Sequence, residues 1–341
     1  MKKEEVNLMR GLDEKHLEGF KKSDWFSFYK EHQEELFLGI RNNYINLYYK
    51  GMNIAKIQGS FNNASISARY IYKDFNEESN YQSITYDDFK QKYEKVIKPE
   101  VEKHIKKNKL WEKETQQALI LKNNKNCRNN KSNWLCIDME YTNQREDSKS
   151  NEEKSFGRFD IIAVNKNNYK VALIELKVGK NAIGGKSGLL KHAKDWQDFV
   201  DKQLFFKDIN EGHNCLKQEI INIINNKCIL ESNYPIGYCS EETFKNIEPS
   251  FYFIICSGTM TIGEIKNEVR KYLWSEDKCM RYNIKRVSNT YNVENDIDIG
   301  YDISKKGAGK LYCEFLFTEG LRDNIKINDI IDDENYDRNI E

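Results

Sequence analysis

The chain has 341 residues and a formal net charge of zero, with 32% charged and 39% hydrophobic residues. A chain of this length can bury one large core and still form a smaller second domain. No apolar run approaches the ~20 residues that a membrane-spanning helix needs, and the N-terminus lacks the apolar segment of a secretory signal. The composition therefore argues against a membrane protein and makes a cytoplasmic location the default expectation.

The cysteines and the charge pattern narrow the class further. The eight cysteines include no C-x-x-C pair, so a zinc ribbon is not expected. Residues 103–131 contain nine Lys/Arg against two Glu, and residues 319–341 contain eight acidic and three basic residues. The basic stretch suits phosphate binding, although a solvated helix face explains it equally simply. Residues 319–341 are predicted to form an acidic C-terminal tail.

The first 82 residues are predicted to form a region of helices and small β-hairpins. Residues 1–35 have helical character, with Ser23 and Asp24 as candidate capping residues. From 36 to 73, apolar and polar residues alternate around Asn42-Asn43 and again around Lys50-Gly51, which predicts a small antiparallel sheet. The role of this region is left open, because its tyrosine-rich hairpin suits core packing as well as base stacking.

Residues 83–318 are predicted to form a second domain of mixed structure. Residues 85–122 have helical composition with a break near Pro99, and an Asn/Lys-rich loop follows at 123–133. The predicted elements beyond are strands at 134–141, 157–165 and 170–178, an amphipathic helix at 188–206, a strand at 251–257, a helix at 262–274 and a strand at 311–317. This order predicts an α/β (α+β) fold with a mixed sheet flanked by helices.

The hairpin at 157–178 yields the most specific prediction. A two-residue turn at Asn167-Asn168 would pair residues whose numbers sum to 335. Asp160 then lies opposite Glu175, and Arg158 lies opposite Lys177, with side chains on one face. Both faces of these strands are otherwise apolar, so helices are expected to cover both sides of the sheet.

Two carboxylates facing each other on an apolar ribbon need a neutralising partner, because like charges placed opposite one another destabilise a sheet. A divalent cation held between Asp160 and Glu175 supplies that charge, since Mg²⁺ is bound by one or two carboxylates plus substrate phosphates. Lys177 would point to the same face and would hold or activate a water near the metal. The alternative is an exposed edge hairpin in which these residues form a surface ion-pair ladder.

Asp160, the hairpin turn and Glu175-Leu176-Lys177 resemble the signature of the PD-(D/E)xK superfamily of restriction-endonuclease-like nucleases. The order helix, three strands, helix, strand from about 105 to 257 is similar to the family core. The resemblance implies that Asp160 and Glu175 ligate Mg²⁺ or Mn²⁺ and that Lys177 assists the attacking water. Phe159 stands where the family has proline, which weakens the match slightly.

Several other acidic residues are candidates for the metal site. Glu140 is a candidate third ligand if Trp134, Cys136, Asp138 and Glu140 share one face of their strand, although Asp138 and Glu140 also suit the polar end of a strand. Glu114 lies on the helix before the first core strand, where many family members place a metal-linked glutamate. A helix surface is rich in glutamate in any case, so Glu114 is the less specific candidate.

Four basic residues are candidates for binding phosphate or nucleic acid. Arg158 would grip a phosphate next to the metal. His192 and Lys191 lie near the start of the helix after Lys177, and His192 suits either a phosphate contact or packing beside Trp196. Lys186 belongs to a glycine-rich segment that narrowly fails the P-loop pattern G-x-x-x-x-G-K-[ST], because Lys180 occupies the first glycine position. That segment is expected to approach the nucleic-acid backbone or to serve as a plain linker.

The sequence thus predicts a Mg²⁺-dependent deoxyribonuclease that hydrolyses phosphodiester bonds. The resemblance favours DNA over RNA and suggests a bacterial defence or DNA-processing role by fold analogy. The alternatives are a catalytically silent nucleic-acid-binding or scaffold protein and a hydrolase of nucleotides. A homodimer is left open, and a membrane partner is not expected.

Overall fold

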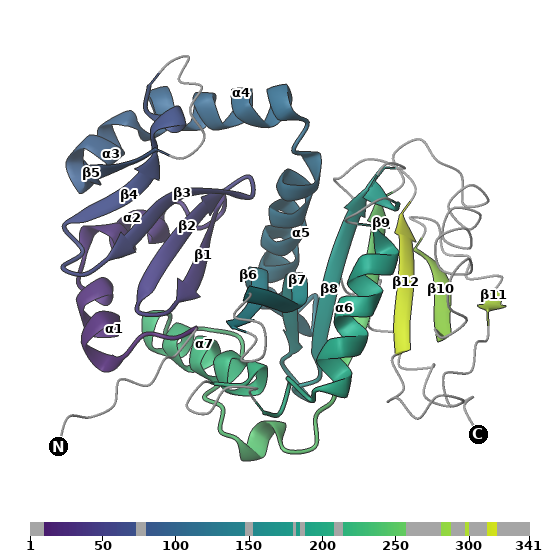
Figure 1. Cartoon of the computed structure of the whole chain (residues 1–341). Helices are drawn as coiled ribbons and strands as arrows, with labels where there is room; N and C mark the ends of the chain where they lie inside the picture. Colours follow the sequence, from purple (N-terminus) through teal and green to yellow (C-terminus); the bar gives the residue numbers. More distant parts are fainter. Residues whose placement is uncertain are drawn as a thin grey trace. The chain divides into compact units, whose positions relative to one another are not determined.

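The computed structural model describes residues 10–72, 80–146, 153–179, 182–184, 188–207, 214–256, 281–287, 297–299 and 312–318. Its mixture of helices with one antiparallel and one mixed sheet confirms the predicted fold class (Figure 1). The chain divides into two compact units: unit 1 comprises Met1–Leu121 and Gly212–Glu241, and unit 2 comprises Lys122–Glu211 and Glu242–Glu341. This division differs from the boundary expected after residue 82, and the acidic tail lies outside the described residues.

Unit 1 contains a five-stranded antiparallel sheet in the order β1-β2-β3-β4-β5. Its strands are β1 (Leu36–Arg41), β2 (Tyr44–Tyr49), β3 (Met52–Gln58), β4 (Asn63–Ser67) and β5 (Tyr81–Thr85). Its helices are α1 (Glu14–Lys21), α2 (Asp24–Glu31), α3 (Tyr86–Lys92), α4 (Lys98–Asn108), the first part of α5 (Trp111–Arg128) and α7 (Leu216–Leu230), with a short 3₁₀ turn at Ala68–Tyr70.

The two predicted hairpin turns of this sheet are confirmed. Asn43 has a φ of 55° in the first turn, and Lys50 and Gly51 have φ values of 48° and 78° in the second. A Cβ atom on Gly51 would collide with the carbonyl of Lys113, so both the backbone conformation and the space require glycine there. Ser23 caps α2 through its side chain, which accepts a hydrogen bond from the Phe26 N–H, as its position predicted.

The helical segment after β5 differs from the expectation in where it breaks. Pro99 lies in the first turn of α4, directly after a π-helical turn at Tyr93–Ile97. Proline fits there because its missing N–H is an unpaired group of the first turn anyway. The main break falls at Lys109, which adopts a left-handed conformation with a φ of 53° and ends α4. Beyond it, α5 continues through 123–128, which the sequence had suggested to be a loop.

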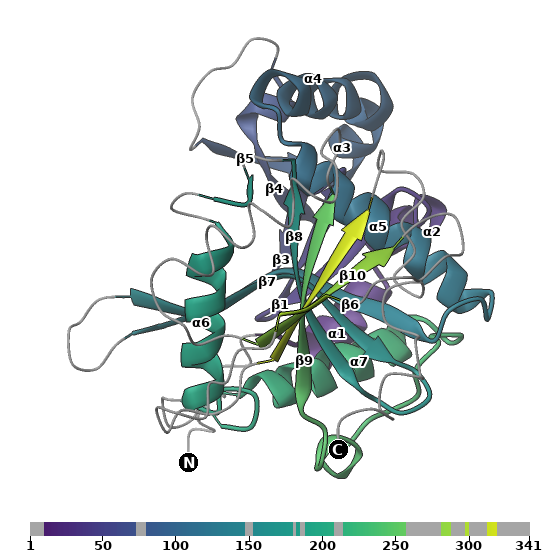
Figure 2. The same cartoon turned by 90° about the vertical axis from the view of Figure 1, so that its right-hand side faces the viewer.

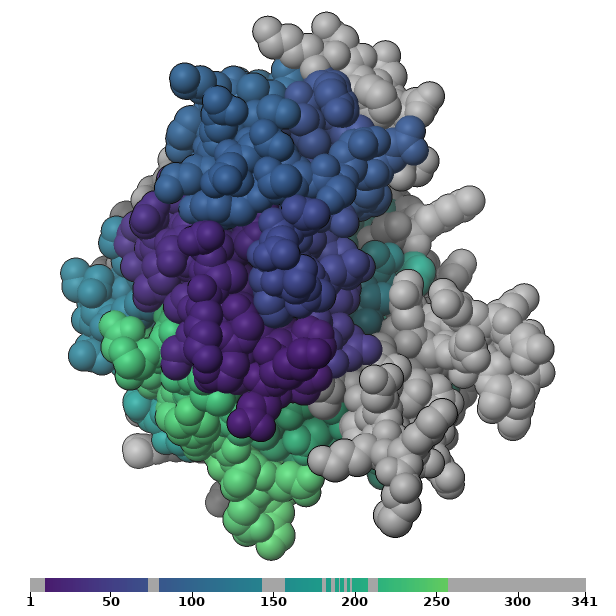
Figure 3. Space-filling view, turned by 90° about the vertical axis from the view of Figure 1, so that its left-hand side faces the viewer, coloured from purple at the N-terminus to yellow at the C-terminus, as the bar shows by residue number. Residues whose placement is uncertain are grey.

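Unit 1 joins segments that lie far apart in the sequence. The amide of Asn226 in α7 accepts a hydrogen bond from the Leu12 N–H at 2.8 Å and donates one to the Leu12 carbonyl at 3.2 Å. Figure 3 shows the result, with the purple N-terminal segment and the green α7 side by side. α7 was not predicted from the sequence.

Unit 2 contains a seven-stranded mixed sheet in the order β11-β10-β12-β9-β8-β7-β6. Its strands are β6 (Trp134–Glu146), β7 (Glu153–Asn165), β8 (Val171–Val178), β9 (Pro249–Cys256), β10 (Arg281–Val287), β11 (Ile297–Ile299) and β12 (Tyr312–Thr318). β6, β7 and β8 form an antiparallel meander, and β9 runs parallel to β8. α6 (Leu189–Asp201) lies alongside these strands (Figure 2), and a 3₁₀ turn spans Glu242–Phe244.

The predicted register of the β7–β8 hairpin is confirmed. The paired residues run from Ile161 opposite Ile174 to Val164 opposite Val171, and each pair sums to 335. The turn itself differs from the prediction. Residues 166–169 form a four-residue loop in which Tyr169, with a φ of 59°, takes the left-handed conformation expected of an asparagine. The Asn165 side chain stabilises the loop by accepting a hydrogen bond from the Asn167 N–H at 2.9 Å.

Both faces of the strands in unit 2 are buried, as predicted. Ile161 and Ile174 on one face and Ile162 and Leu173 on the other are each 0% exposed. The C-terminal part of α5 lies against β6, an edge strand of the sheet, where the Asn124 amide pairs with both backbone groups of Cys136 at 2.8 and 2.9 Å. Asn124 thereby satisfies backbone groups that a neighbouring strand would otherwise pair.

Two further predictions concern the C-terminal third and membranes. The predicted strand at 311–317 corresponds to β12, whereas the predicted helix at 262–274 lies outside the described residues. Within the described parts of the chain, no helix combines the length and the apolar character needed to cross a bilayer.

Candidate functional site

Three polar side chains meet in the otherwise apolar core of unit 2. Glu175 Oε1 accepts a hydrogen bond from Lys177 Nζ at 2.6 Å, and His192 Nε2 lies 2.9 Å from the same oxygen. The Lys177 Nζ and His192 Nε2 atoms are 3.4 Å apart. The side chains of Glu175, Lys177 and His192 are 3%, 5% and 8% exposed. We call these three residues the Glu175 cluster.

His192 is neutral at pH 7 within this cluster. Burial lowers the pKa of His192 to about 4, and the positive charge of Lys177 acts in the same direction. The 2.9 Å contact with Glu175 is therefore a hydrogen bond rather than an ion pair. A proton on Nε2 makes this contact attractive, whereas a proton on Nδ1 would set the Nε2 lone pair against a carboxylate oxygen. Nδ1 is then a bare acceptor, buried and without a hydrogen-bond partner among the described residues.

Two packing contacts hold α6 so that His192 reaches Glu175. At the start of the helix, a Cβ atom on Gly188 would lie 2.5 Å from the carbonyl oxygen of Ile183, so this close approach requires glycine. One turn beyond His192, Trp196 stacks on Phe253 with ring centroids 4.4 Å apart. Phe253 is the register partner of Glu175 across β8 and β9. The Trp196 stack therefore sets the rotation of α6 over the Glu175 cluster.

Asp160 contacts β8 in a way that the predicted pairing of residues in the hairpin did not include. In the described parts of β7 and β8, the backbone ladder ends at the pair Ile161–Ile174, and position 160/175 carries no ladder pair. Instead, Asp160 Oδ2 accepts a hydrogen bond from the backbone N–H of Leu176 at 2.7 Å. The carboxylate of Asp160 thus takes the place of a backbone carbonyl beside Glu175.

Asp160 leaves the backbone ladder because the pleat of β7 is interrupted there. Ile162 pairs with Leu173, so strict alternation would place Phe159 on the face opposite to theirs. Phe159 nevertheless contacts Trp196 and Phe251, with ring centroids 5.9 and 6.2 Å apart, and Phe251 is the register partner of Leu173. The alternation of side chains is therefore interrupted between Phe159 and Ile162, the stretch that contains Asp160.

Glu140 marks the same irregularity on the neighbouring strand. It has a φ of 54°, which is uncommon for a residue other than glycine, and no ladder pair joins it to Asp160 within the described parts of β6 and β7. A further register shift lies between Cys136 and Asp138. Simple alternation therefore does not place Trp134, Cys136, Asp138 and Glu140 on one face, as the sequence suggested. Irregular strand geometry of this kind is over-represented next to active sites.

The basic candidates lie in different settings. Arg158 is exposed, its backbone carbonyl accepts a hydrogen bond from Trp196 Nε1 at 3.2 Å, and its charge adds to the lowering of the His192 pKa. Lys191 is half exposed and pairs with Asp195 at 2.7 Å on the surface of α6. Lys186 lies outside the described residues. The charge of Lys191 lowers the pKa of His192 as well, so Arg158 and Lys191 both act electrostatically on the cluster.

Glu114, the acidic candidate on the helix before the first core strand, belongs to unit 1. Glu114 lies in the part of α5 that is assigned to unit 1, where its carboxylate is 3.5 Å from Lys50 Nζ. Its predicted role in the metal site remains a prediction.

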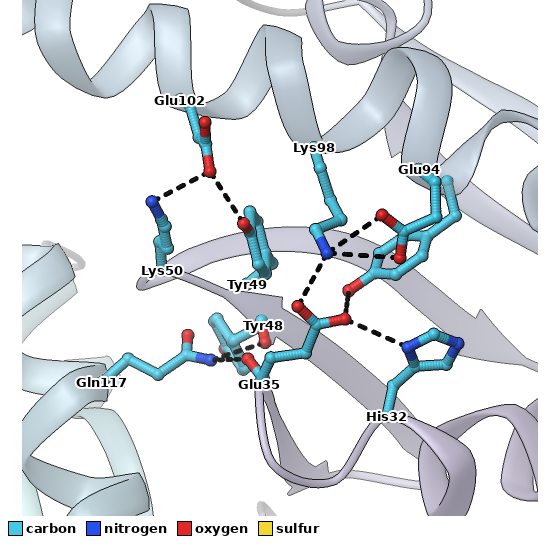
Figure 4. A network of polar contacts seen from close by, with 10 residues as sticks. His32, Glu35, Tyr48, Tyr49, Lys50, Glu94, Lys98, Glu102 and Gln117 are labelled. Carbon is cyan, nitrogen blue, oxygen red and sulfur yellow. Dashed lines mark hydrogen bonds and ion pairs between the residues drawn. The ribbon is translucent and has the colours of Figure 1, made fainter.

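A different group of metal-ligand side chains lies in unit 1. Among the described residues, His32, Glu35 and Glu94 are the one set of three His, Cys, Asp or Glu whose ligand atoms all lie within 4.8 Å of one another. Lys98 already occupies the space between the two carboxylates, with Nζ 2.8 Å from Glu35 and 3.1 Å from Glu94 (Figure 4). Tyr93 donates to Glu35 as well, at 3.0 Å. We therefore interpret this group as an ion-pair network and not as a metal site.

The carboxylates predicted to bind metal do not form such a set. Glu140, Asp160 and Glu175 are all described, yet their ligand atoms do not all lie within 4.8 Å of one another. The donor types nonetheless suit a hard cation, because Mg²⁺ takes oxygen ligands and needs only one or two carboxylates from a protein. The two carboxylates of Asp160 and Glu175 are sufficient in number and type for Mg²⁺, without a third protein ligand.

Comparisons with known proteins add no relative: no protein-family model, no curated protein and no solved structure matches the chain.

The sequence did not predict the contact between His192 and Glu175. The spacing of Leu189, His192, Trp196 and Phe199 places all four on one face of α6, and three of them are apolar. That pattern contains the signal for a histidine directed at the sheet. The spacing does not reveal that Glu175 is the partner of His192, because this contact depends on the register between β8 and β9.

Proposed function

We propose that unit 2 is a metal-dependent nuclease that hydrolyses phosphodiester bonds, with DNA favoured over RNA as its substrate. The observation that carries this proposal is the buried carboxylate of Glu175, held between Lys177 and His192, next to the distorted position of Asp160. The order helix, antiparallel meander, helix, parallel strand is similar to the PD-(D/E)xK core suggested by the sequence. A cytoplasmic location is part of the same proposal.

The buried charges favour a functional reading of the cluster over a purely structural one. Burying a carboxylate and an ammonium costs more than burying apolar side chains of similar volume, and replacing such pairs by apolar residues is often neutral or stabilising. The remaining residues of β8 from Val171 to Leu176, apart from Glu175, are apolar and 0% exposed. A strand with this composition does not need Glu175 and Lys177 for its packing.

Each residue of the proposed site has a distinct role. Asp160 and Glu175 would hold the cation, which when bound lowers the pKa of a water and offsets the charge that develops on the phosphate. Lys177, which donates a hydrogen bond to Glu175, supplies a positive charge close to the reacting phosphate. Arg158, exposed beside the cluster, would bind a neighbouring phosphate of the polymer.

The first prediction concerns cleavage itself. We expect the protein to cleave plasmid or single-stranded DNA with Mg²⁺ or Mn²⁺ and not with EDTA. Glu175→Gln and Lys177→Ala should each lower the rate by about 100-fold or more, because they remove charges that act in the transition state. Asp160→Asn should have a comparable effect. Asp198→Asn, which changes an exposed carboxylate of α6, serves as the matched control and should leave the rate unchanged.

The same assay separates the rival functions. RNA is included as a substrate, and phosphate release from ATP tests hydrolysis of nucleotides. Nucleic-acid binding without cleavage under all of these conditions would point to a catalytically silent binding protein. Cleavage that survives unchanged in folded Glu175→Gln and Lys177→Ala proteins, as judged by circular dichroism, would show that the Glu175 cluster is not the active site.

A further inference from the structure

Two donors from two different elements converge on one oxygen of Glu175. Lys177 reaches Oε1 from the same strand, and His192 reaches it from α6. An ammonium on a four-carbon stem follows a carboxylate that rotates, because its donors have no fixed direction. The imidazole is rigid, and its helix is fixed one turn later by the Trp196 stack on Phe253. The contact with His192 therefore restricts the rotation of the Glu175 carboxylate more than the contact with Lys177 does.

His192 is too buried to bind a polyanion in the way that the sequence suggested. Its side chain is 8% exposed, and Nε2 is already used by Glu175. A purely structural role fits poorly as well, since Nδ1 is a buried acceptor without a hydrogen-bond partner among the described residues. An apolar side chain of similar volume would pack at this position without leaving such an atom.

We infer that His192 is a positioning residue, which uses its Nε2–H to fix the orientation of the Glu175 carboxylate for the metal-dependent cleavage proposed above. The inference rests on that proposed function and adds to it a residue that acts through Glu175 without touching substrate. Partners that orient a metal-binding side chain typically change metal affinity or activity by roughly 10–100-fold when they are removed. The effect of His192 belongs in that range.

The decisive comparison is between two variants at one position. His192→Leu removes the donor and keeps an apolar volume, whereas His192→Gln places an amide N–H near the position of Nε2. We expect His192→Leu to weaken Mn²⁺ binding, measured by calorimetry, by roughly 10–100-fold and to lower kcat with little change in KM for DNA. His192→Gln should recover most of both losses. Asp198→Asn, at an exposed position of α6, is the control and should match the unmodified protein.

A second measurement does not depend on activity or metal. The ¹⁵N chemical shifts of the imidazole in the unmodified protein at pH 7 report which nitrogen carries the proton, and the His192 signals are those lost in His192→Gln. We expect the Nε2–H tautomer, and we expect Glu175→Gln to shift these signals. A proton on Nδ1, or signals unaffected by Glu175→Gln, would overturn the inference.

The outcomes separate the two proposals. If the unmodified protein neither cleaves DNA nor binds Mn²⁺, the proposed function fails, and the positioning role fails with it. If it cleaves while His192→Leu cleaves and binds Mn²⁺ equally well, only the inference about His192 fails. A loss confined to KM for DNA would instead return His192 to the phosphate contact that the sequence suggested.

Discussion

At the scale of single residues, unit 1 depends on one buried amide. Gln117, which is 1% exposed, donates to the carbonyl oxygens of Glu35 and Tyr48 at 2.8 and 2.9 Å and accepts a hydrogen bond from the Gly51 N–H at 2.6 Å (Figure 4). Glu35 directly precedes β1, Gly51 lies in the turn between β2 and β3, and Tyr48 lies in β2 next to its register shift. One side chain of α5 thereby ties the strand entry at Glu35 to the hairpin turn at Gly51.

Gln117→Leu should destabilise the protein strongly. The substitution keeps the volume but leaves three backbone groups without their partner, and each buried group of this kind costs about 1–3 kcal/mol. We expect a loss of about 3 kcal/mol or more in the free energy of unfolding, measured with urea by circular dichroism. Gln91→Leu, at an exposed position of α3, should change it by about 0.5 kcal/mol or less. Equal effects of the two changes would contradict the role assigned to Gln117.

At the scale of elements, the C-terminal part of α5 is held by tertiary hydrogen bonds and not by its own propensity. Asparagine is a poor helix former, which is why the asparagines at 123–130 suggested a loop. Asn123 donates to the Trp134 carbonyl at 2.7 Å, and Asn124 pairs with both backbone groups of Cys136. These bonds offset the low propensity and cover the edge of β6 at the same time.

Asn124→Ala should therefore destabilise unit 2, although alanine is the better helix former. It removes the two hydrogen bonds from Asn124 to the N–H and the carbonyl of the fully buried Cys136, and the loss of a partner by a buried group costs about 1–3 kcal/mol. Asn126→Ala is the matched control, because it gains the same propensity at a half-buried position of the same helix. The difference in unfolding free energy between the two variants should be about 2 kcal/mol or more. No difference would show that the Asn124 bonds contribute nothing.

The same elements show how far the sequence determines the fold. The register between β7 and β8 was predictable from the turn, because a connection centred between Asn167 and Asn168 pairs residues that sum to 335 whether it spans two or four residues. The distortion at Asp160 was not, since it depends on Phe159 turning toward α6. α7 escaped prediction because it is buried on most sides and so lacks the polar stripe that reveals an amphipathic helix.

At the scale of the whole molecule, the candidate site and the networks of unit 1 depend on contacts between distant parts of the sequence. Lys98 and Glu35 are 63 positions apart, and Asn226 and Leu12 are 214 positions apart. Local patterns do not specify such pairs. The Glu175-Leu176-Lys177 segment could be identified because charged residues are unusual in a buried strand. The ion-pair network around Glu35 consists of residue types that are common on any surface, so its sequence did not reveal it.

The charged contacts of unit 1 predict how stability depends on pH. Burial acts to raise the pKa of Glu35, but hydrogen bonds from Lys98, His32 and Tyr93 outweigh it and lower the pKa. The hydrogen bond from Lys50 lowers the pKa of Glu102 despite the opposing effect of burial. In Asp13, burial again acts upward and is outweighed by hydrogen bonds from His16 and Lys15. All three carboxylates therefore bind protons more weakly in the folded chain than their ordinary values of 3.8 and 4.5 imply.

A carboxylate with a lowered pKa stabilises the folded state above its unfolded pKa, and this contribution is lost as the pH falls through the folded pKa. We therefore expect the melting temperature to be steady from pH 7 to about pH 5 and to fall between about pH 4.5 and pH 3. Glu35→Gln should lower the melting temperature at pH 7 and flatten this fall, because the variant has one fewer group to protonate. Glu14→Gln, at an exposed position of α1, is the control and should keep the full pH dependence. A Glu35→Gln curve that runs parallel to that of the unmodified protein would show that Glu35 does not contribute to acid unfolding.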